Sequence, residues 1–308
     1  MPSPFPITHS PSLLNHATAA YLGLALGDAL GATVEFMTPR EIASQYVCHD
    51  RIRGGGWLRL KPGQVTDDTT MSLALGQSIL ELGRVEAHAA ALAFDTWMRS
   101  KPVDIGNTVR RGIVEFRRTG RPAREVSEHD AGNGAAMRVL PVALAGVAQE
   151  DARLTAQCLA QAHVTHHNPL SDAATVCLAA MVRDALAGKD KQALLARADD
   201  LVDRHPAFEY RHRLRENPSG YVVETLQAVF QAFADTDNFR DCLVDVVNRG
   251  GDADTTGAIA GMLAGALYGP ESLPGDWLAP LDPAIRSACT QQAQALVNLP
   301  ASSMRRPS

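Results

Sequence analysis

The chain has 308 residues, a formal net charge of −5 and 45% hydrophobic residues, which is enough for a large hydrophobic core in one domain or two. The slight acidic excess lacks the basic footprint of a nucleic-acid-binding protein, and we find neither a secretory signal nor an uninterrupted apolar run of about 18 residues that would span a membrane. The five cysteines are odd in number and form no CxxC pair, which is typical of reduced thiols in a cytoplasmic protein.

No proline- or serine-rich linker, low-complexity tract or fixed-period repeat divides the chain. We therefore expect one domain over residues 12–300, with a proline-rich arm at 1–11 before it and a tail at 301–308 after it. Alanine and leucine dominate, and runs of alternating β-branched residues are nearly absent. This composition favours an all-α packing of about ten helices.

The first helix is expected at 12–30, where apolar and small residues recur at helical spacing. Gly23, Gly27 and Gly31 follow one another at four-residue intervals, so they line one face of this helix and permit close contact with another helix. We interpret these glycines as packing residues.

Residues 31–65 are interrupted by three consecutive glycines and by prolines, and we expect a long irregular connection of the kind that often carries function. After it, the helical pattern returns in segments at about 69–82, 86–100, 106–118, 133–147, 151–164, 171–187, 191–203, 219–234, 239–247, 254–267 and 283–297.

Two runs far apart in the chain combine aspartate with threonine, and each opens a helical pattern: Thr66-Asp67-Asp68-Thr69-Thr70 and Asp252-Ala253-Asp254-Thr255-Thr256. Clustered carboxylates repel one another unless a cation or shared protons offset their charge. Carboxylate and hydroxyl oxygens are hard donors that suit Mg²⁺, Mn²⁺ or Ca²⁺, whereas Zn²⁺ and copper sites usually recruit His or Cys. The two runs therefore predict two halves of one magnesium- or manganese-type site.

The alternative interpretation is that each run is only a helix N-cap. Asp and Thr are good caps, and negative charge is favoured at the N-terminus of a helix. A cap requires one such residue, whereas each run has two aspartates and at least one threonine. The residues alone leave both interpretations open.

Other candidate residues lie in or beside the predicted loops, and each has an ordinary structural explanation. Glu35 would be a solvated charge, Asp104 a turn former or helix cap, and Tyr221 a core aromatic. The turn Asp130-Ala131-Gly132-Asn133-Gly134 offers backbone N–H groups at an expected helix start, a setting that suits a pyrophosphate.

The segment Thr165-His166-His167-Asn168-Pro169 invites a zinc interpretation. Adjacent histidines cannot point the same way on one helix, however, and we find no third soft ligand near them. We therefore expect no zinc here, with one of the two histidines lining a cleft and the other serving the structure.

Three segments, in this order over roughly residues 17–270, resemble the ADP-ribosylglycohydrolase family: Gly23-Leu24-Ala25-Leu26-Gly27-Asp28-Ala29-Leu30-Gly31, Thr66-Asp67-Asp68-Thr69 and Gly250-Gly251-Asp252-Ala253-Asp254-Thr255-Thr256-Gly257. Further segments resemble the bacterial branch of that family that activates dinitrogenase reductase: Gly55-Gly56-Trp57, Lys61-Pro62-Gly63-Gln64-Val65, Asn133-Gly134-Ala135-Ala136-Met137-Arg138 and Thr165-His166-His167-Asn168-Pro169.

The resemblance implies a single all-α domain whose cleft holds two Mn²⁺ or Mg²⁺ ions, and hydrolysis of the N-glycosidic bond between ADP-ribose and an arginine side chain. By position, the implied metal ligands are Thr66, Asp67, Asp68, Asp252, Asp254 and Thr255. Asp28 would lie just behind these ligands.

The same resemblance implies roles around the substrate. Asp104 or Glu35 would assist proton transfer, and which of them is the acid stays open. The residues that would contact the substrate are Asn107 at the ribose, Gly132, Asn133 and Gly134 at the pyrophosphate, His166 in the cleft and Tyr221 stacked on the adenine side.

The branch resemblance further implies that the substrate is the ADP-ribosylated iron protein of nitrogenase, and that a PII-type signalling protein can hold the enzyme at the membrane through an ammonium channel. We otherwise expect a cytoplasmic protein. Two other functions remain: a general hydrolase of serine-linked or small-molecule ADP-ribose conjugates, and a catalytically silent family member, against which the intact Asp67, Asp68, Asp252 and Asp254 argue.

Overall fold

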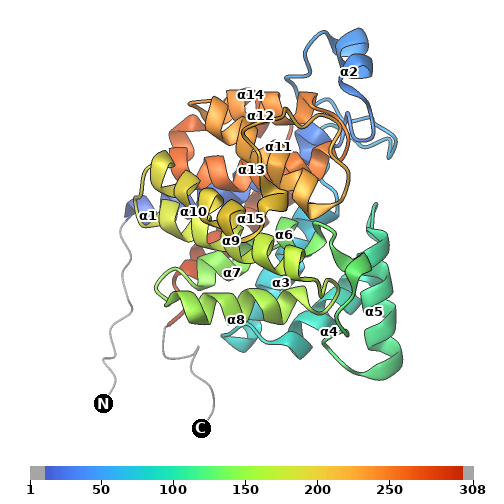
Figure 1. Ribbon diagram of the computed structural model, residues 1–308, viewed down its shortest axis with the longest axis vertical. Helices are drawn as coiled ribbons and strands as arrows, with labels where there is room; N and C mark the ends of the chain where they lie inside the picture. The colour runs from blue at the N-terminus through green and yellow to red at the C-terminus, as the bar shows by residue number, and fades with distance from the viewer. Residues whose placement is uncertain (1–10, 301–308) are drawn as a thin grey trace.

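Helices build the part of the chain that the computed structural model describes, residues 11–300 (Figure 1). No named β-strand occurs in that range, so the all-α prediction is confirmed. The α-helices are α1 (Pro11–Gly31), α2 (Pro39–Tyr46), α3 (Asp67–Leu82), α4 (Ala87–Arg99), α5 (Asn107–Thr119), α6 (Gly134–Met137), α7 (Leu140–Ala145), α8 (Asp151–Ala162), α9 (Pro169–Leu186), α10 (Lys191–Arg204), α11 (Val222–Asp235), α12 (Phe239–Asn248), α13 (Ala253–Tyr268), α14 (Gly275–Leu278) and α15 (Pro283–Val297). Short 3₁₀ turns lie at Glu128–Asp130, Pro206–Phe208 and Pro270–Ser272.

Most of these helices begin and end within three residues of their predicted bounds. The segment expected as one helix at 133–147 is instead divided into α6 and α7, because Pro141 lacks the N–H that a continuous helix would need. The predicted arm at 1–11 lies outside the described residues except for Pro11, with which α1 begins, and the predicted tail at 301–308 lies wholly outside them.

The connection expected to be irregular over residues 31–65 contains α2, which the sequence analysis did not anticipate. Thr38 and Glu41 form a reciprocal capping box at its start, with Pro39 at the first helical position. This start signal is present in the sequence. Figure 1 shows α2 projecting from the upper right of the molecule, away from the remaining helices.

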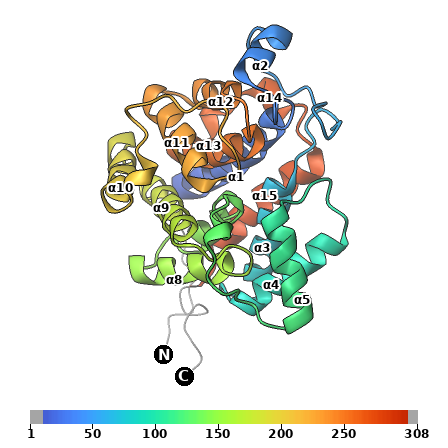
Figure 2. The ribbon, with the colours of Figure 1, turned by 45° about the vertical axis from the view of Figure 1, so that its right-hand side comes forward.

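The centre of the fold is the antiparallel pair α1 and α13, which pack against each other more extensively than any other helices of the described chain (Figure 2). Glycines permit this close approach, as expected. A Cβ atom on Gly27 would lie only 1.9 Å from the carbonyl oxygen of Gly257, and one on Gly23 would lie 2.2 Å from that of Gly261. Helices α9, α11 and α12 cover α13, which is buried from Ala253 to Ala266.

Helix α3 packs against α1 of this central pair, and it also packs against α15, α7 and α4. Its first turn begins beside the C-terminal end of α1, near the start of α13. The two Asp/Thr runs therefore belong to helix starts that the packing of α1, α3 and α13 brings together. None of the helices in residues 11–300 is long and apolar enough to cross a membrane.

Candidate active site

The two Asp/Thr runs meet in the structure. Thr66 Oγ1 lies 3.3 Å from Asp68 Oδ2 and 3.4 Å from Asp254 Oδ2. From the other run, Thr255 Oγ1 lies 3.3 Å from the same Oδ2 atom of Asp68. All of these side chains are buried. The hydrogen bonds are long for hydroxyl donors, so the oxygens are gathered without being tightly bonded to one another.

The N-cap interpretation does not account for these side chains. Thr66 and Asp252 do occupy the N-cap positions of α3 and α13, but neither side chain makes a capping hydrogen bond. Their oxygens are directed elsewhere: Asp252 Oδ2, for example, accepts a 2.6 Å hydrogen bond from the Asn133 amide.

Asp28 of α1 holds the start of α3 from behind. Its carboxylate accepts hydrogen bonds from the backbone N–H groups of Thr66 and Thr69 at 3.0–3.1 Å, and from the Thr69 hydroxyl at 2.5 Å. Burial raises the pKa of Asp28 to about 6, although these hydrogen bonds oppose the shift. A side chain from another helix thus supplies the cap that Thr66 does not.

The gathered carboxylates have little positive charge to offset them. Within residues 11–300 no Lys, Arg or His forms an ion pair with Asp67, Asp68, Asp252 or Asp254. The Oδ1 atom of Asp68 is buried without a hydrogen-bond partner. Burying unpaired carboxylate is costly, so this arrangement fits a cation held by hard oxygen ligands.

Burial and the crowding of carboxyl groups raise their pKa values. Burial, followed by the charges of Asp104 and Asp28, raises the pKa of Asp67 to about 7. Burial and neighbouring carboxylates raise the pKa values of Asp68 and Asp254 well above their usual range. Burial also raises the pKa of Asp252, against the hydrogen bond from Asn133.

A cavity of about 450 Å³ opens above this cluster. Most of the predicted site residues line it: Glu35, Asp67, Asp104, Asn107, Gly132, Asn133, Gly134, His166, Asp252, Asp254 and Thr255. Thr66 and Asp68 do not line it, because they lie deeper in the cluster, and Tyr221 does not line it either. The predicted substrate and metal residues are thus brought to one place, with Tyr221 outside it.

Glu35 reaches the cavity from the loop after α1. One oxygen each of Glu35, Asp104 and Asp254 can be chosen so that all three lie within 4.8 Å of one another. Trp57 Nε1 donates a 2.6 Å hydrogen bond to Glu35 Oε2. Burial, followed by the charges of Asp252, Asp104 and Asp67, raises the pKa of Glu35 to about 8, while the Trp57 hydrogen bond opposes the shift.

Trp57 and Phe36 are cavity residues that the sequence analysis did not assign to the site. Their rings lie 5.4 Å apart between centroids, and both are more than half exposed, at 52% and 64%. Trp57 stands in the Gly55-Gly56-Trp57 motif, so a signal for it was available. An exposed aromatic pair at a cavity mouth is typical of a surface that contacts a ligand.

Asp104 and Asn107 stand where α5 begins. The N-cap of α5 is Gly106, so Asp104 is not the cap that one interpretation proposed. Its Oδ1 atom accepts a 2.7 Å hydrogen bond from the N–H of the next residue, Ile105, as a turn former does. The Gly106 N–H lies 3.3 Å from Asp67 Oδ2, which connects this turn to the aspartate cluster.

The Gly132-Asn133-Gly134 turn differs from the predicted pyrophosphate cradle in two respects. The helix that follows it, α6, has only four residues, and the Asn133 N–H is already bonded to Gly220 O at 3.0 Å. The Asn133 side-chain amide instead bridges Asp252 Oδ2 and Thr225 Oγ1, at 2.6 and 3.0 Å. Sequence reasoning missed Thr225 because it lies inside α11 and carries no motif.

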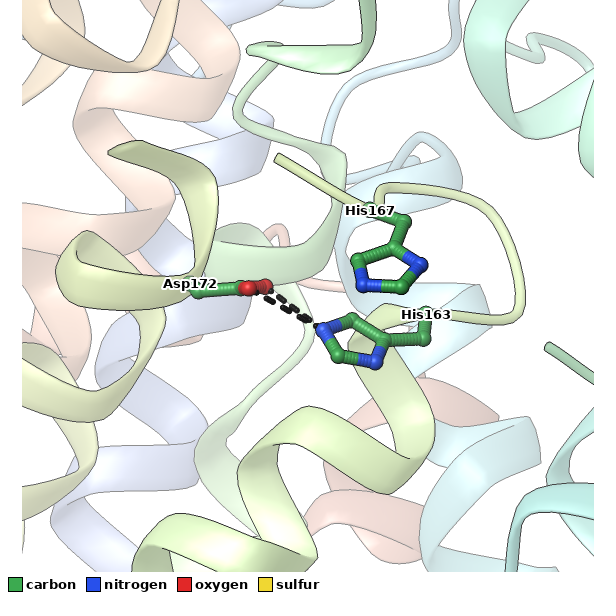
Figure 3. A group of neighbouring side chains, drawn as sticks. All are labelled: His163, His167 and Asp172. Atoms are coloured by element: carbon green, nitrogen blue, oxygen red, sulfur yellow. Dashed lines mark hydrogen bonds and ion pairs between the residues drawn. The ribbon is translucent and has the colours of Figure 1, made fainter. Parts of the chain in front are cut away.

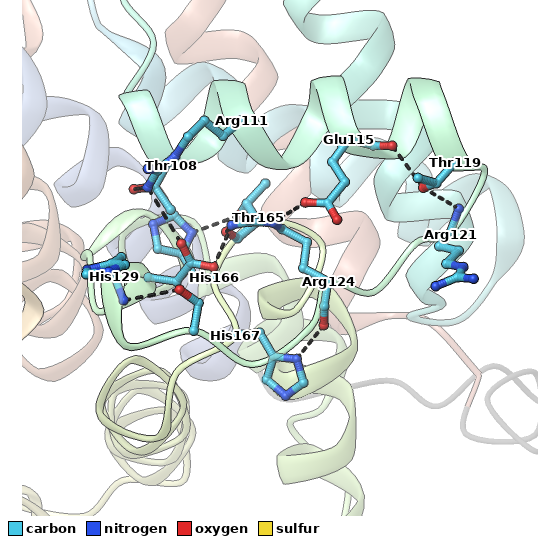
Figure 4. A network of polar contacts seen from close by, with 12 residues as sticks. Thr108, Arg111, Glu115, Thr119, Arg121, Arg124, His129, Thr165, His166 and His167 are labelled. Carbon is cyan, nitrogen blue, oxygen red and sulfur yellow. Dashed lines mark hydrogen bonds and ion pairs between the residues drawn. The ribbon is translucent and has the colours of Figure 1, made fainter.

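His166 is buried at the cavity wall, and His167 points elsewhere (Figure 4). The His166 ring has room only because glycines face it: a Cβ on Gly134 would lie 2.7 Å from His166 Cε1. Burial, followed by the positive charges of Arg138, Arg124 and Arg111, lowers the pKa of His166 well below its usual value. The ring is therefore a neutral imidazole, and Thr165 Oγ1 lies 2.8 Å from its Nδ1.

Tyr221 lies beside this wall. Its backbone forms an isolated bridge with Gly132, and the residue is 39% exposed. The prediction that Tyr221 stacks on the adenine side of a ligand is therefore compatible only with a ligand that extends beyond the cavity.

The pKa shifts predict how pH affects the metal-free protein. Glu35 and Asp67 bind protons more tightly in the folded chain, with pKa values of about 8 and 7, than in the unfolded chain. The folded state thus carries more protons, so its free energy of unfolding should fall as pH rises through about 6 to 8, by on the order of a few kcal/mol. Urea unfolding in EDTA at the two ends of this range measures the fall. Mn²⁺ should remove most of it, and a metal-free protein that is more stable at the alkaline end would contradict the assignment of these shifts.

Comparisons with known proteins agree over nearly the whole chain. The sequence model of the ADP-ribosylglycohydrolase family matches residues 9–305. The ADP-ribosyl-(dinitrogen reductase) glycohydrolase of Rhodospirillum rubrum is 50% identical over 289 residues, which cover 94% of this chain and 98% of that protein. The ADP-ribosylarginine hydrolase Tri1 of Pseudomonas putida is 36% identical over 282 residues, covering 86% of this chain and 74% of that protein.

A solved structure, described as an ADP-ribosylglycohydrolase-related protein complex, has the same fold. It superimposes with a TM-score of 0.84 at 35% identity, and the match covers 94% of this chain and 99% of that chain. The helix order, the aspartate cluster and these matches lead to one conclusion: the chain is an enzyme of the ADP-ribosylglycohydrolase family.

Proposed function

We propose that the protein hydrolyses the N-glycosidic bond between ADP-ribose and an arginine side chain of a target protein, and that the target is dinitrogenase reductase. The observation that carries the proposal is the meeting of two Asp/Thr runs beneath a cavity whose wall also holds Glu35 and Asp104. The relatives from Rhodospirillum rubrum and Pseudomonas putida support the substrate, since their names specify dinitrogen reductase and ADP-ribosylarginine.

The aspartate cluster supports the proposal that the enzyme uses two divalent cations, Mn²⁺ or Mg²⁺. The residues that would hold them are Thr66, Asp67, Asp68, Asp252, Asp254 and Thr255. The oxygens of Thr66, Asp68, Asp254 and Thr255 converge, and Asp67 and Asp252 line the cavity beside them. When bound, such cations supply Lewis acidity towards the sugar oxygens and lower the pKa of a coordinated water.

The chain's own residues carry out the proton transfers. Glu35 and Asp104 face the cavity, and the Trp57 hydrogen bond occupies Glu35 Oε2. The other oxygen of Glu35 is left for a substrate group. Either carboxyl can deliver a proton to the departing guanidine or accept one from the attacking water, a contribution of about 10²–10⁴-fold in rate. The neutral His166 ring can orient the ligand by a hydrogen bond without adding charge.

The cavity mouth favours a guanidinium over a serine oxygen as the leaving group. A guanidinium is planar, cationic and rich in N–H donors, so it is best bound by carboxylates and by the faces of aromatic rings. Glu35 and Asp104 provide the carboxylates, while Phe36 and Trp57 provide exposed rings beside them. A serine linkage needs neither feature.

The experiment that tests this proposal compares ADP-ribose release from arginine-modified and serine-modified proteins at equal Mn²⁺. We expect strong preference for the arginine linkage, with little turnover of serine-linked or O-acetyl-ADP-ribose. Trp57→Phe keeps a ring but removes the donor to Glu35, so it should slow release without reversing the preference. Faster release from the serine-modified protein would support the general hydrolase instead, and no release from either would support the silent binding protein.

The remaining elements of the proposal concern partners. We retain a PII-type signalling protein as a regulatory partner and membrane association through that partner, on the basis of the branch resemblance alone. A pull-down with the PII protein, with and without its effectors, tests this point separately from catalysis.

A further inference from the structure

A second group of metal-ligating side chains lies at the turn between α8 and α9, where His163, His167 and Asp172 converge (Figure 3). One ligand atom from each lies within 4.8 Å of the others. His163 Nε2 is 3.0 Å from both carboxylate oxygens of Asp172, and the two imidazole rings stack with centroids 3.7 Å apart. None of the three residues lines the active-site cavity.

The tautomer of His167 is set by its surroundings. Its Nδ1 atom lies 2.6 Å from the backbone oxygen of Arg124, which can only accept a hydrogen bond. Nδ1 therefore carries the proton, and the lone pair of Nε2 is free on the side of the ring that faces His163 and Asp172 (Figure 3). A metal-ligating histidine usually donates its other N–H to a carbonyl or carboxylate in this way.

The backbone around these ligands is also held in place. The Arg124 N–H donates to His163 O at 3.0 Å, and the Ser127 N–H donates to His167 O at 2.9 Å. Arg124 itself is bonded to Glu115 and to Thr165 O, as Figure 4 shows. The side chains of His163 and Asp172 are 20% and 22% exposed, so solvent reaches the group and water can complete a coordination shell.

We propose that His163, His167 and Asp172 form a second metal site, selective for a borderline divalent cation such as Zn²⁺. Two imidazoles, one carboxylate and a water make a tetrahedral zinc shell with bonds of about 2.0–2.2 Å. This ligand set differs from the all-oxygen cluster in the cavity, which selects harder ions. The two rings are stacked only 20° from parallel, so one of them must rotate about its side-chain bonds as the ion binds for both in-plane lone pairs to reach it.

This proposal departs from the expectation of no zinc near residues 165–169. That expectation concerns the adjacent pair His166 and His167, and His166 does lie apart, in the cavity wall. In the structure, His163 and Asp172 of α9 lie near His167 in place of His166. A bound ion would join the end of α8 to the start of α9, and it would hold the loop that carries His166.

The test uses full-length protein without an affinity tag, saturated with Mg²⁺ so that the oxygen cluster is occupied. Titration with Zn²⁺ at about pH 7.5, where free imidazoles are neutral, should show one bound ion and a rise in melting temperature. His167→Ala and Asp172→Asn should each weaken binding by at least about 10–100-fold, while the exposed His212→Ala should leave it unchanged.

Cobalt gives a readout that does not depend on the variants' stability. Co²⁺ bound to the Mg²⁺-saturated wild type should show the intense visible absorption of a tetrahedral site with nitrogen ligands, and Zn²⁺ should displace it. The proposal is overturned if the wild type binds no Zn²⁺ under these conditions, if His167→Ala binds it with unchanged affinity, or if bound Co²⁺ shows only a weak octahedral spectrum. Hydrolytic activity is not the readout, so failure here leaves the proposed function unaffected.

Discussion

Asp67→Ala and Asp252→Ala should each reduce ADP-ribose release by more than about 10³-fold and lower the Mn²⁺ content, because each removes a carboxylate from one half of the cluster. Asp67 belongs to the start of α3 and Asp252 to the start of α13, so the two variants test both halves separately. Helicity should persist, since neither side chain caps its helix. Measurements are hydrolysis rate, metal stoichiometry by calorimetry and circular dichroism.

Controls separate the metal ligands from the residues that contact substrate. Asp200→Ala changes an exposed helical aspartate and should alter nothing. Asp104→Asn and Glu35→Gln should retain full metal content while losing about 10²–10⁴-fold in rate. Unchanged metal stoichiometry in both Asp67→Ala and Asp252→Ala would reject the paired site, and loss of metal from Asp104→Asn would add Asp104 to the ligands.

Gly27→Val should destabilise the protein severely, because the new side chain would have to occupy space taken by the backbone of α13. A Cβ alone would lie 1.9 Å from Gly257 O, and backbone atoms cannot rotate out of the way as side chains can. Overpacking typically costs about 1–3 kcal/mol, and contact with backbone places this variant at or above the upper end. Gly275→Ala is the control, since the Cβ it would add has no atom within 4 Å apart from its chain neighbours and the backbone of its own helix.

Urea unfolding curves measure the loss of stability in the Gly27 variants, and titration with Mn²⁺ measures whether metal binding also weakens. Gly27 precedes Asp28, which holds the start of α3, and Gly257 follows Thr255 by two residues. Separating α1 from α13 should therefore weaken Mn²⁺ binding in Gly27→Ala even if that milder variant folds. Equal stability of Gly27→Ala and Gly275→Ala would show that the close approach is not needed.

Periodicity and helix signals predicted most of the fold, because the residues within and beside a long helix are enough to indicate where it begins and ends. The errors arose where one residue overrules a pattern: Pro141 divides a helical stretch, and the Thr38–Glu41 capping box begins a helix inside an expected loop. Both signals are legible in the sequence. The composition of the longer stretches around them predicted a continuous helix at 133–147 and an irregular connection at 31–65 instead.

The site was predictable to the extent that its residues stand in motifs. The two Asp/Thr runs could be paired from their chemistry, and the structure brings them together. Thr225 and the second ligand set of His163 and Asp172 could not be paired, because only packing brings these residues near their partners. The hydrogen bond from the Asn133 N–H to the Gly220 carbonyl oxygen likewise depends on a tertiary contact.

The pairing of α1 with α13 also constrains how the protein is made. These helices stand near opposite ends of the chain, so a ribosome releases α1 long before its partner has been synthesised. During that interval the glycine-lined face of α1 lacks its native partner and stays exposed to non-native contacts. Contacts of such long sequence separation also slow folding. Only a chain translated through Tyr268 can assemble the site, so truncated products should be inactive and prone to aggregate.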